Sequence, residues 1–492
     1  MANNDDTNPN NEISSPGITY PTPYIPDPES IRIPSDFTIE AVKLYPWNGA
    51  TPIDLTNVRG TINIFEDIFN NFLTGNITVA DAWDLPMLYP LIGEEFLEIS
   101  FKRPGTKNQG TSNAAESPDY RYGFEEQIRY LVETESFVMK FRVIKMTDRK
   151  LVRDRAQSYT LHFTSEEFIS NKKNKFRKSY IDTLYSDMVK DVYDTFLNKG
   201  KPIVIESTMY EQDFVFSNWT PSQCVNIVAA RSIANGRSGS NYVFFETVAG
   251  FNFVSLEKLF EAKEKETLLY QPANIMITPP NRPIDEEVRN IYEFDYVDYF
   301  DVVSNLQHGM YAAKLLTVDP IRRIYEEYDF DYAKEFDRFK HLEKNKVCTD
   351  GLDAMGEPYM ARFDLLMTNK DHDKVDWIVS REPGIKPTQL EFYVLQRQSQ
   401  MQQLNNVRIA VTVPGNTERH AGDVIAFALP NAMGSPIMWD EPEKYLSGRY
   451  LISAIRHRIE ANGYHQDIEL VKDSFLSKIE YIDPIPIYLP TW

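Results

Sequence analysis

Residues 214–260 constrain the fold most, because they specify a helix, a hairpin and a second helix in direct succession. Thr220 can cap a helix, and Pro221 suits the first helical position, where its missing N–H leaves no hydrogen bond unmade. Gln223 can complete a capping box by reaching back to the Thr220 amide. The next apolar residues recur at helical spacing as far as Ile233. The pattern therefore predicts an amphipathic helix that begins at Pro221.

The hairpin follows this helix directly. The helix should stop near residues 235–236, and a turn rich in glycine and serine leads into a buried strand at residues 242–245. Residues 249–250 turn the chain back into a second strand at residues 251–254, and a short helix follows Ser255. The unit contains no polar cluster suited to chemistry, so the sequence indicates function through architecture rather than through an active site.

A helical stripe precedes this unit. Apolar residues from Ile181 to Leu197 fall on one face at helical spacing, which is far more typical of a core than of a cofactor site. Residues 200–202 should end that helix, and residues 203–205 predict a short strand. We therefore expect an α/β domain over residues 166–280.

Residues 37–165 predict a run of strands, because apolar and polar residues alternate along several short segments. A polar, turn-rich insertion at residues 104–123 interrupts them. About seven antiparallel strands with mostly short loops predict a small closed barrel or a sandwich. The alternating apolar positions are Ile62, Ile64, Ile77, Val79, Leu97, Ile99 and Phe101, and further strands are expected at residues 127–132, 137–146 and 158–163.

A second strand set is predicted over residues 281–330 and 389–475, with an insertion at residues 331–388 between the two parts. The insertion opens with a charged, amphipathic segment at residues 331–344 that predicts a helix. Near the end of the set, residues 462–463 are Asn-Gly, which is a strong hairpin signal.

The second strand set resembles the first in its order of elements. Residues 93–101 and residues 422–427 both begin with a glycine turn and an acidic residue and continue as an alternating strand. We expect an internal duplication. The predicted fold class is a multidomain α+β protein, with two antiparallel β-barrel domains flanking a smaller α/β domain.

Both ends of the chain are rich in proline. Residues 1–36 begin with a polar stretch and continue with six prolines, which favour an extended arm; a flexible lead-in and an arm laid on a neighbour are both open. Residues 476–492 form a tail in which proline blocks a helix or a central strand. Its apolar side chains are costly to leave in water, at ~25 cal/mol per Å². Docking on the chain itself and docking on a partner are both open. The candidate docking residues are Ile482, Ile485, Ile487, Tyr488, Leu489 and Trp492.

Composition excludes several classes of function. A net charge of −20 argues against a grip on nucleic acid, which needs clustered Lys and Arg. Two cysteines are too few for a disulfide framework, which indicates synthesis in a reducing cytoplasm. The N-terminus lacks the basic start and apolar core of a signal peptide. No window approaches the ~20 apolar residues of a membrane span, so we expect no membrane anchor.

No residue pattern indicates a catalytic, cofactor or metal site. Residues 371–373 are Asp-His-Asp, but adjacent side chains on a polar loop rarely converge on one ion. His457 and His465 lie on the two strands of the last hairpin and are interpreted as surface residues. Residues 236–240 lack the Gly-Lys-Ser/Thr ending of a phosphate loop, and no Gly-x-Ser-x-Gly elbow is present. We therefore expect no catalytic, cofactor-binding or metal-binding residues.

Four groups of residues carry a resemblance to a known family. They are residues 73–81 with 90–95, residues 218–221 with 238–246 and 250–256, residues 413–417 with 421–425, and residues 446–452 continued through His457 to 473–474. In this order they resemble the baseplate central hub of contractile-tailed bacteriophages, over about residues 37–475. The first group resembles one tube-like barrel of such hubs, the second their α/β domain, and the last two the second tube-like barrel.

The resemblance implies a structural protein without enzymatic activity. It implies a homotrimer that adapts a sixfold tail tube above to a threefold spike below, since two barrels per chain place six around the axis. Other baseplate proteins would be neighbours, and genomic DNA would pass through the channel without specific binding. The location implied is the tail baseplate of the virion, after assembly in the host cytoplasm. The alternatives are a tail-associated glycan hydrolase, which needs paired carboxylates in a cleft, and a carbohydrate-binding adhesin.

Overall fold

The computed structural model describes residues 34–35, 37–102, 137–153, 156–270, 287–319, 323–348, 363–367, 390–429 and 443–479. Outside the described residues lie the predicted strand at 127–132, the insertion at 104–123, the segment 371–373, the candidate docking residues at 482–492 and nearly all of the arm at 1–36.

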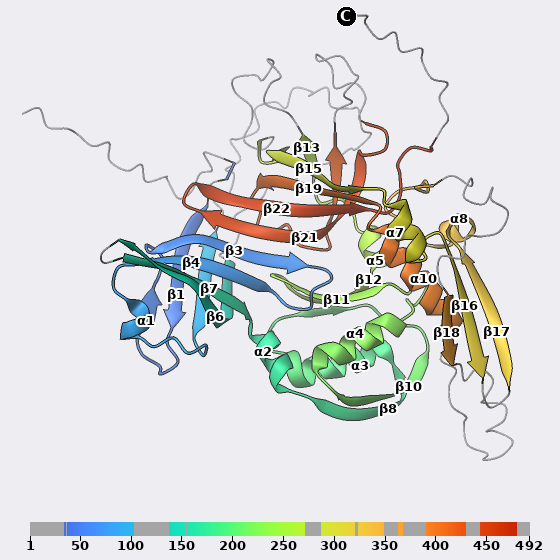
Figure 1. The fold of residues 1–492 in the computed structure, drawn as a ribbon, viewed down its shortest axis with the longest axis horizontal. Helices are drawn as coiled ribbons and strands as arrows, with labels where there is room; N and C mark the ends of the chain where they lie inside the picture. The colour runs from blue at the N-terminus through green and yellow to red at the C-terminus, as the bar shows by residue number, and fades with distance from the viewer. Residues whose placement is uncertain are drawn as a thin grey trace, which may run out of the picture.

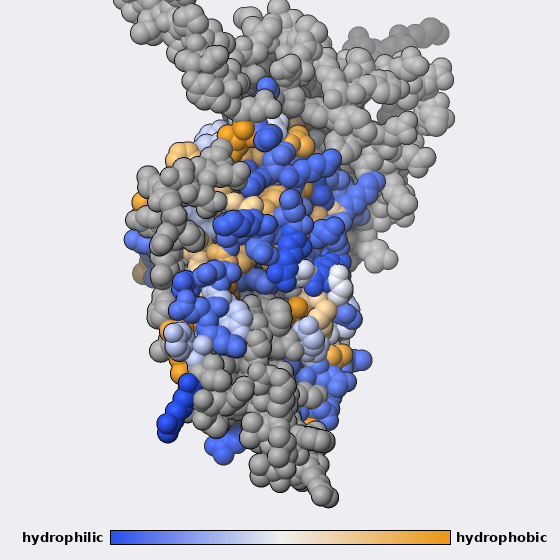
Figure 2. Space-filling model, turned by 90° about the vertical axis from the view of Figure 1, so that its right-hand side faces the viewer, coloured by the Kyte–Doolittle hydropathy of each residue, from blue (hydrophilic) through white to orange (hydrophobic). Residues whose placement is uncertain are grey.

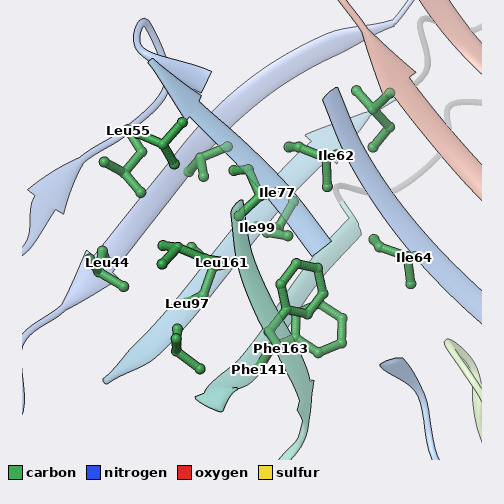
Figure 3. Close-up of a cluster of buried hydrophobic side chains, with 14 of the residues drawn as sticks. Leu44, Leu55, Ile62, Ile64, Ile77, Leu97, Ile99, Phe141, Leu161 and Phe163 are labelled. Atoms are coloured by element: carbon green, nitrogen blue, oxygen red, sulfur yellow. The ribbon is translucent and has the colours of Figure 1, made fainter. Parts of the chain in front are cut away.

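The first strand set curls around one apolar core. Its neighbouring strands follow the order β3–β4–β7–β6–β5–β1, and the strands at both ends of this order point side chains into the same cluster. Figure 3 shows this cluster, in which the rings of Phe141 and Phe163 lie 4.6 Å apart. All the alternating positions predicted from the sequence are buried. The elements are β1 (Thr38–Tyr45), β2 (Ile53–Asp54), β3 (Arg59–Asp67), β4 (Thr74–Asp81), α1 (Leu85–Leu88), β5 (Phe96–Lys102), β6 (Phe137–Arg153) and β7 (Ala156–Ser165).

The second strand set encloses another apolar core. Its strands follow the order β15–β19–β22–β21–β20–β13. Strand β14 pairs with β13, while β15, which starts two residues after β14 ends, pairs with β19. The elements are β13 (Thr267–Tyr270), β14 (Asn290–Ile291), β15 (Glu293–Tyr299), α7 (Val302–Gln307), β19 (Val407–Pro414), β20 (Val424–Ala428), β21 (Gly448–Glu460) and β22 (Gly463–Lys472).

The two sets share one strand order. β3, β4, β7, β6 and β5 correspond to β15, β19, β22, β21 and β20, and all neighbouring pairs among them are antiparallel in both sets. A register shift follows Val143 in β6 and Ile452 in β21 at the same place in the hairpin. The two sets differ at their last strand, because β13 runs parallel to β20 whereas β1 runs antiparallel to β5.

The expectation of two separate closed barrels is not met, because the described strands of the two sets, β1–β7, β13–β15 and β19–β22, form one sheet of 14 strands. The reason is that β3 of the first set pairs with β21 of the second. Figure 1 shows β15, β19, β22, β21, β3 and β4 one below another across this join. The fold is therefore mixed α+β and dominated by sheet.

The α/β unit packs beneath this sheet in Figure 1 around its own core. The predicted capping box is confirmed, because the Thr220 amide donates to Gln223 Oε1 over 3.0 Å at the start of α4. The predicted buried hairpin is also confirmed, as β11 and β12. The elements are α2 (Glu166–Lys173), β8 (Phe176–Leu184), α3 (Tyr185–Val192), a π-helical turn (Tyr193–Leu197), β9 (Ile203–Ile205), β10 (Glu211–Trp219), α4 (Pro221–Arg231), β11 (Tyr242–Thr247), β12 (Gly250–Ser255) and α5 (Leu256–Phe260).

Two helix predictions are wrong. The spacing predicts Ile181 on a buried helical face, but Ile181 lies in β8 and is exposed, because β8 pairs with β10 and α3 begins only at Tyr185. The helix predicted at residues 331–344 ends early: α8 (Tyr332–Glu335) gives way to a 3₁₀ turn (Phe336–Arg338). Charge pattern alone did not show that this short segment follows a strand directly.

A separate three-stranded sheet forms beside α10 (Leu390–Gln403). It comprises β16 (Ala312–Asp319), β17 (Ile324–Asp331) and β18 (Phe363–Met367). The sequence predicts residues 312–319 and 324–330 as part of the second strand set, yet they do not join its sheet. The described residues on this side of the molecule are mainly hydrophilic, with scattered apolar side chains (Figure 2). None of the helices in the described segments combines the length and apolar composition that a membrane span requires.

Candidate functional site: the seam between the strand sets

The seam is the antiparallel pairing of β3 with β21. It runs from Ile62 opposite Ile459 to Asp67 opposite Ala454. Ile62 is completely buried, so a slip of one residue would expose the apolar face of β3 to water. Asn63 fixes the register further, since its Oδ1 accepts a hydrogen bond from Arg456 Nε over 2.9 Å. The seam therefore has one defined register, set by both an apolar and a polar contact.

Glu66 lies at the end of the seam. It is completely buried where β3, the hairpin turn of the α/β unit and the turn before β20 meet. Its Oε1 accepts from the Val248 amide over 2.9 Å, and its Oε2 accepts from the Ala421 amide over 2.8 Å. His420 Nδ1 and His457 Nε2 approach Oε1 at 3.4 and 3.5 Å. Burial by itself would raise the pKa of Glu66, but hydrogen bonds and positive charge from the two histidines hold that pKa well below its ordinary value. One carboxylate thus ties β3 to the hairpin turn of the α/β unit and to the turn before β20.

The polar cluster continues into the second strand set. His457 Nδ1 lies 2.8 Å from Tyr464 Oη, and Gln466 Nε2 donates to the Asn416 carbonyl over 2.8 Å. Arg419 is 1% exposed, and its Nη1 donates to Gln466 Oε1 over 2.5 Å. These contacts hold the turn at residues 414–422 against the strands, so the turn supplies the Ala421 amide to Glu66 at a fixed place.

The interpretation of the two hairpin histidines is wrong for His457. It is 2% exposed and points toward Glu66, whereas His465 is half-buried with its ring against Tyr292. Sequence analysis also missed Glu66, whose carboxylate joins β3 to the α/β unit and to the turn before β20. The alternation of Ile62 and Ile64 is a signal that could have found it, because Glu66 continues the buried face of β3.

The glycines of the two turns that indicate a duplication have similar φ angles. Gly93 has φ +87° and Gly422 has φ +91°, a conformation in which glycine is strongly preferred. Beyond these turns, the Val143 amide donates to the Glu95 carbonyl over 3.0 Å, and the Ile452 amide donates to the Asp423 carbonyl over 2.9 Å. These equivalent bonds place the two turns at the same point of the two strand sets.

A surface cavity of about 530 Å³ lies beside α5, and Glu257 and Glu261 are among the residues that line it. Both have structural partners: Glu257 accepts from the Gly239 and Lys340 amides, and Glu261 pairs with Arg237. In the part of the chain that the structure describes, no group of three or more His, Cys, Asp and Glu side chains is placed to hold a metal ion.

Comparison with known proteins shows what this architecture is similar to. No model of a protein family matches the chain. The fold resembles the 43 kDa tail protein of prophage MuSo2 from Shewanella oneidensis, with a TM-score of 0.50, 8% identity, and coverage of 88% of this chain and 99% of that one. A tail protein from Neisseria meningitidis MC58 aligns with a TM-score of 0.48 and 9% identity over 88% of this chain and 96% of its own. The overall fold is therefore similar to that of the MuSo2 tail protein.

The amino-acid sequence is also similar to that of a baseplate protein. A probable baseplate hub protein of Vibrio phage KVP40 is 22% identical over 330 residues, which make up 65% of this chain and 73% of that protein. The chain is therefore similar in sequence to a baseplate hub protein, in agreement with the resemblance of its motifs.

Proposed function

We propose that the chain is a structural, non-enzymatic hub of a contractile-tail baseplate, which forms a homotrimer between a sixfold tail tube and a threefold spike. The observation that carries this proposal is the repeated strand order of the two sets together with the seam that joins them side by side. One chain then supplies two equivalent wall segments. Three copies supply six, which is the number a sixfold neighbour requires, and cyclic symmetry lets such a ring close.

Each strand set is proposed to act as one tube-like domain, at residues 37–165 and at residues 281–330 with 389–475. The α/β domain at residues 166–280 buttresses the seam, since Val248 in its hairpin donates to Glu66. The insertion at residues 331–388 would lie outside the ring wall. The arm at residues 1–36 would contact a neighbour.

The bore of this ring would conduct genomic DNA. A chain with a net charge of −20 repels phosphate, so DNA would pass without specific binding. The same role places the protein in the tail baseplate of the virion, after assembly in the host cytoplasm. The candidate docking residues Ile482, Ile485, Ile487, Tyr488, Leu489 and Trp492 would seat the tail at residues 476–492 on the spike or another baseplate protein.

The mass of the purified chain tests this function most directly. We expect native mass spectrometry to give three copies of the 57.0 kDa chain, and averaged electron micrographs to give a ring with a sixfold upper rim. A purified chain that remains monomeric as its concentration is raised would refute the trimer. Glycan hydrolysis that disappears in a Glu257→Gln variant would instead favour the hydrolase, since that carboxylate lines the cavity beside α5.

A further inference from the structure

Two sheet edges lie at opposite ends of the joined sheet. The sheet runs in the order β15–β19–β22–β21–β3–β4–β7–β6 through the seam. β15 pairs with β19 on one side, and the second half of β6 pairs with β7 on one side. Among the described strands, none pairs with the other side of β15 or of residues 144–153. Long strand edges whose backbone N–H and C=O groups have no partner strand are templates for pairing with another chain.

These edges correspond to the two edges that meet in the seam. β6 occupies the place of β21, and β15 occupies the place of β3, in the shared strand order. The register shift after Val143 matches the shift after Ile452, which aligns Lys145 with Ala454. Pairing with β4 and β19 likewise aligns Phe294 with Ile62. The contact that joins the two sets within one chain can therefore be repeated between chains.

We propose that the second half of β6 in one copy pairs antiparallel with β15 of the next copy, in the register that the seam prescribes. This inference rests on the proposed ring and specifies its interface. Transferring the seam register places Lys145 opposite Phe300, Thr147 opposite Asp298, and Lys150 opposite Asp295. The partner of this surface is a second copy of the same chain.

Irregularities in the two strands support this register. β6 has one more residue than β21 between Thr147 and Lys150, where its register against β7 shifts again. β15 has one more residue than β3 between Tyr296 and Asp298. In the proposed register these two extra residues lie beside each other, so the ladder between copies continues without a slip.

The charges of the two edges are complementary. The β6 edge carries Lys145 and Lys150, both exposed. β15 has the sequence EFDYVDY, which contains three acidic residues and no basic one. Opposite charges directly across a strand pair stabilise it, and like charges destabilise it.

Exposed apolar side chains accompany the charges on both edges. Leu151 on β6 is 83% exposed, and Phe300 at the end of β15 is 63% exposed. In the proposed register Leu151 lies opposite Phe294 and Phe300 lies opposite Lys145. Association would therefore remove apolar surface at both ends of the new ladder from water.

Cysteine pairs in the full chain test the register. In a Cys348→Ser background, Lys150→Cys with Asp295→Cys should form disulfide-linked multimers on mild oxidation of the assembled protein. The matched control is Lys150→Cys with Asp298→Cys. Position 298 lies three residues along β15 from the partner of Lys150, about 10 Å away, so this pair should form far fewer disulfide-linked multimers. Two results would refute the interface without refuting the hub function. One is equal cross-linking of both cysteine pairs, and the other is an assembled trimer in which neither pair cross-links.

Charge reversal gives a second measurement. Lys150→Glu and Asp295→Lys should each raise the concentration at which the assembly half-dissociates by roughly tenfold, because like charges then face each other. The double variant should restore assembly, and Lys173→Glu, which lies exposed on α2, should leave it unchanged. Additive losses in the double variant would refute the pairing. A wild-type chain that forms no multimer at all would refute the proposed function together with this interface.

Discussion

Replacing Glu66 by Gln should open the seam. The two oxygens of Glu66 accept from two different backbone amides, Val248 and Ala421, and the side-chain amide of Gln offers only one acceptor. One buried N–H then loses its partner, and His420 and His457 lose a buried negative charge. Removing one member of a buried charged cluster costs about 3–5 kcal/mol, so we expect a loss of stability in that range.

The expected loss depends on pH in a defined direction. The pKa of Glu66 in the folded protein lies below its ordinary value of 4.5, so its contribution is fully present above about pH 4.5. That contribution is lost as the pH falls toward the lower, folded-state pKa. The Gln variant should therefore differ most from the wild type near neutral pH, and the difference should shrink on acidification.

Hydrogen exchange of the β3 and β21 amides is the most direct assay, because it reports local opening of the seam in a chain with several cores. We expect much faster exchange of these amides in the Glu66 variant, alongside a lower midpoint of denaturation. Glu94→Gln is the matched control, since Glu94 is exposed and should change stability by less than about 0.5 kcal/mol. Unchanged exchange along the seam, with a loss below about 1 kcal/mol, would refute the reasoning.

Four further changes have defined outcomes. Gly415→Ala should destabilise the second strand set by at least about 1–3 kcal/mol, because a Cβ there would lie 2.1 Å from the Tyr464 ring. Gly422→Val should reduce assembly, measured by sedimentation, because its φ of +91° strains any β-branched residue. Thr220→Ala should cost about 1 kcal/mol in thermal or denaturant unfolding through loss of the α4 cap. Deleting residues 482–492 should weaken capture of a partner in a pull-down while leaving the strand sets folded.

Each of these outcomes can fail separately. Unimpaired assembly of the Gly422 variant would argue against a structural role for that turn, and an unchanged melting curve for Gly415→Ala would mean that Tyr464 moves freely. For Thr220, substitution by Ser is the control, because a hydroxyl is kept and stability should be preserved. Normal attachment of a spike by the truncated chain would remove the docking proposal for the tail.

Local patterns in the sequence determined many of the elements. Thr220 and Gln223 specify the start of α4, because a capping box depends only on residues three apart. The alternation of Ile62 and Ile64 specifies a strand with one buried face. Gly93 and Gly422 specify turns, because each has a positive φ angle that other residues rarely adopt. The order of these elements was enough to indicate a duplication and a resemblance to baseplate hubs.

Only the tertiary structure decided which edges meet. Alternation defines the face of a strand but says nothing about its neighbour, so the sequence could not show that β3 pairs with β21 and joins both strand sets into one sheet. For the same reason the sequence does not show which groups meet Glu66 and His457, since Val248, Ala421 and Glu66 itself reach these contacts from hundreds of positions away. Pairing with β10 likewise turned Ile181 outward in β8 although its spacing fits a helix. Side-chain spacing is a local property, whereas edge pairing and burial are set by distant segments of the chain.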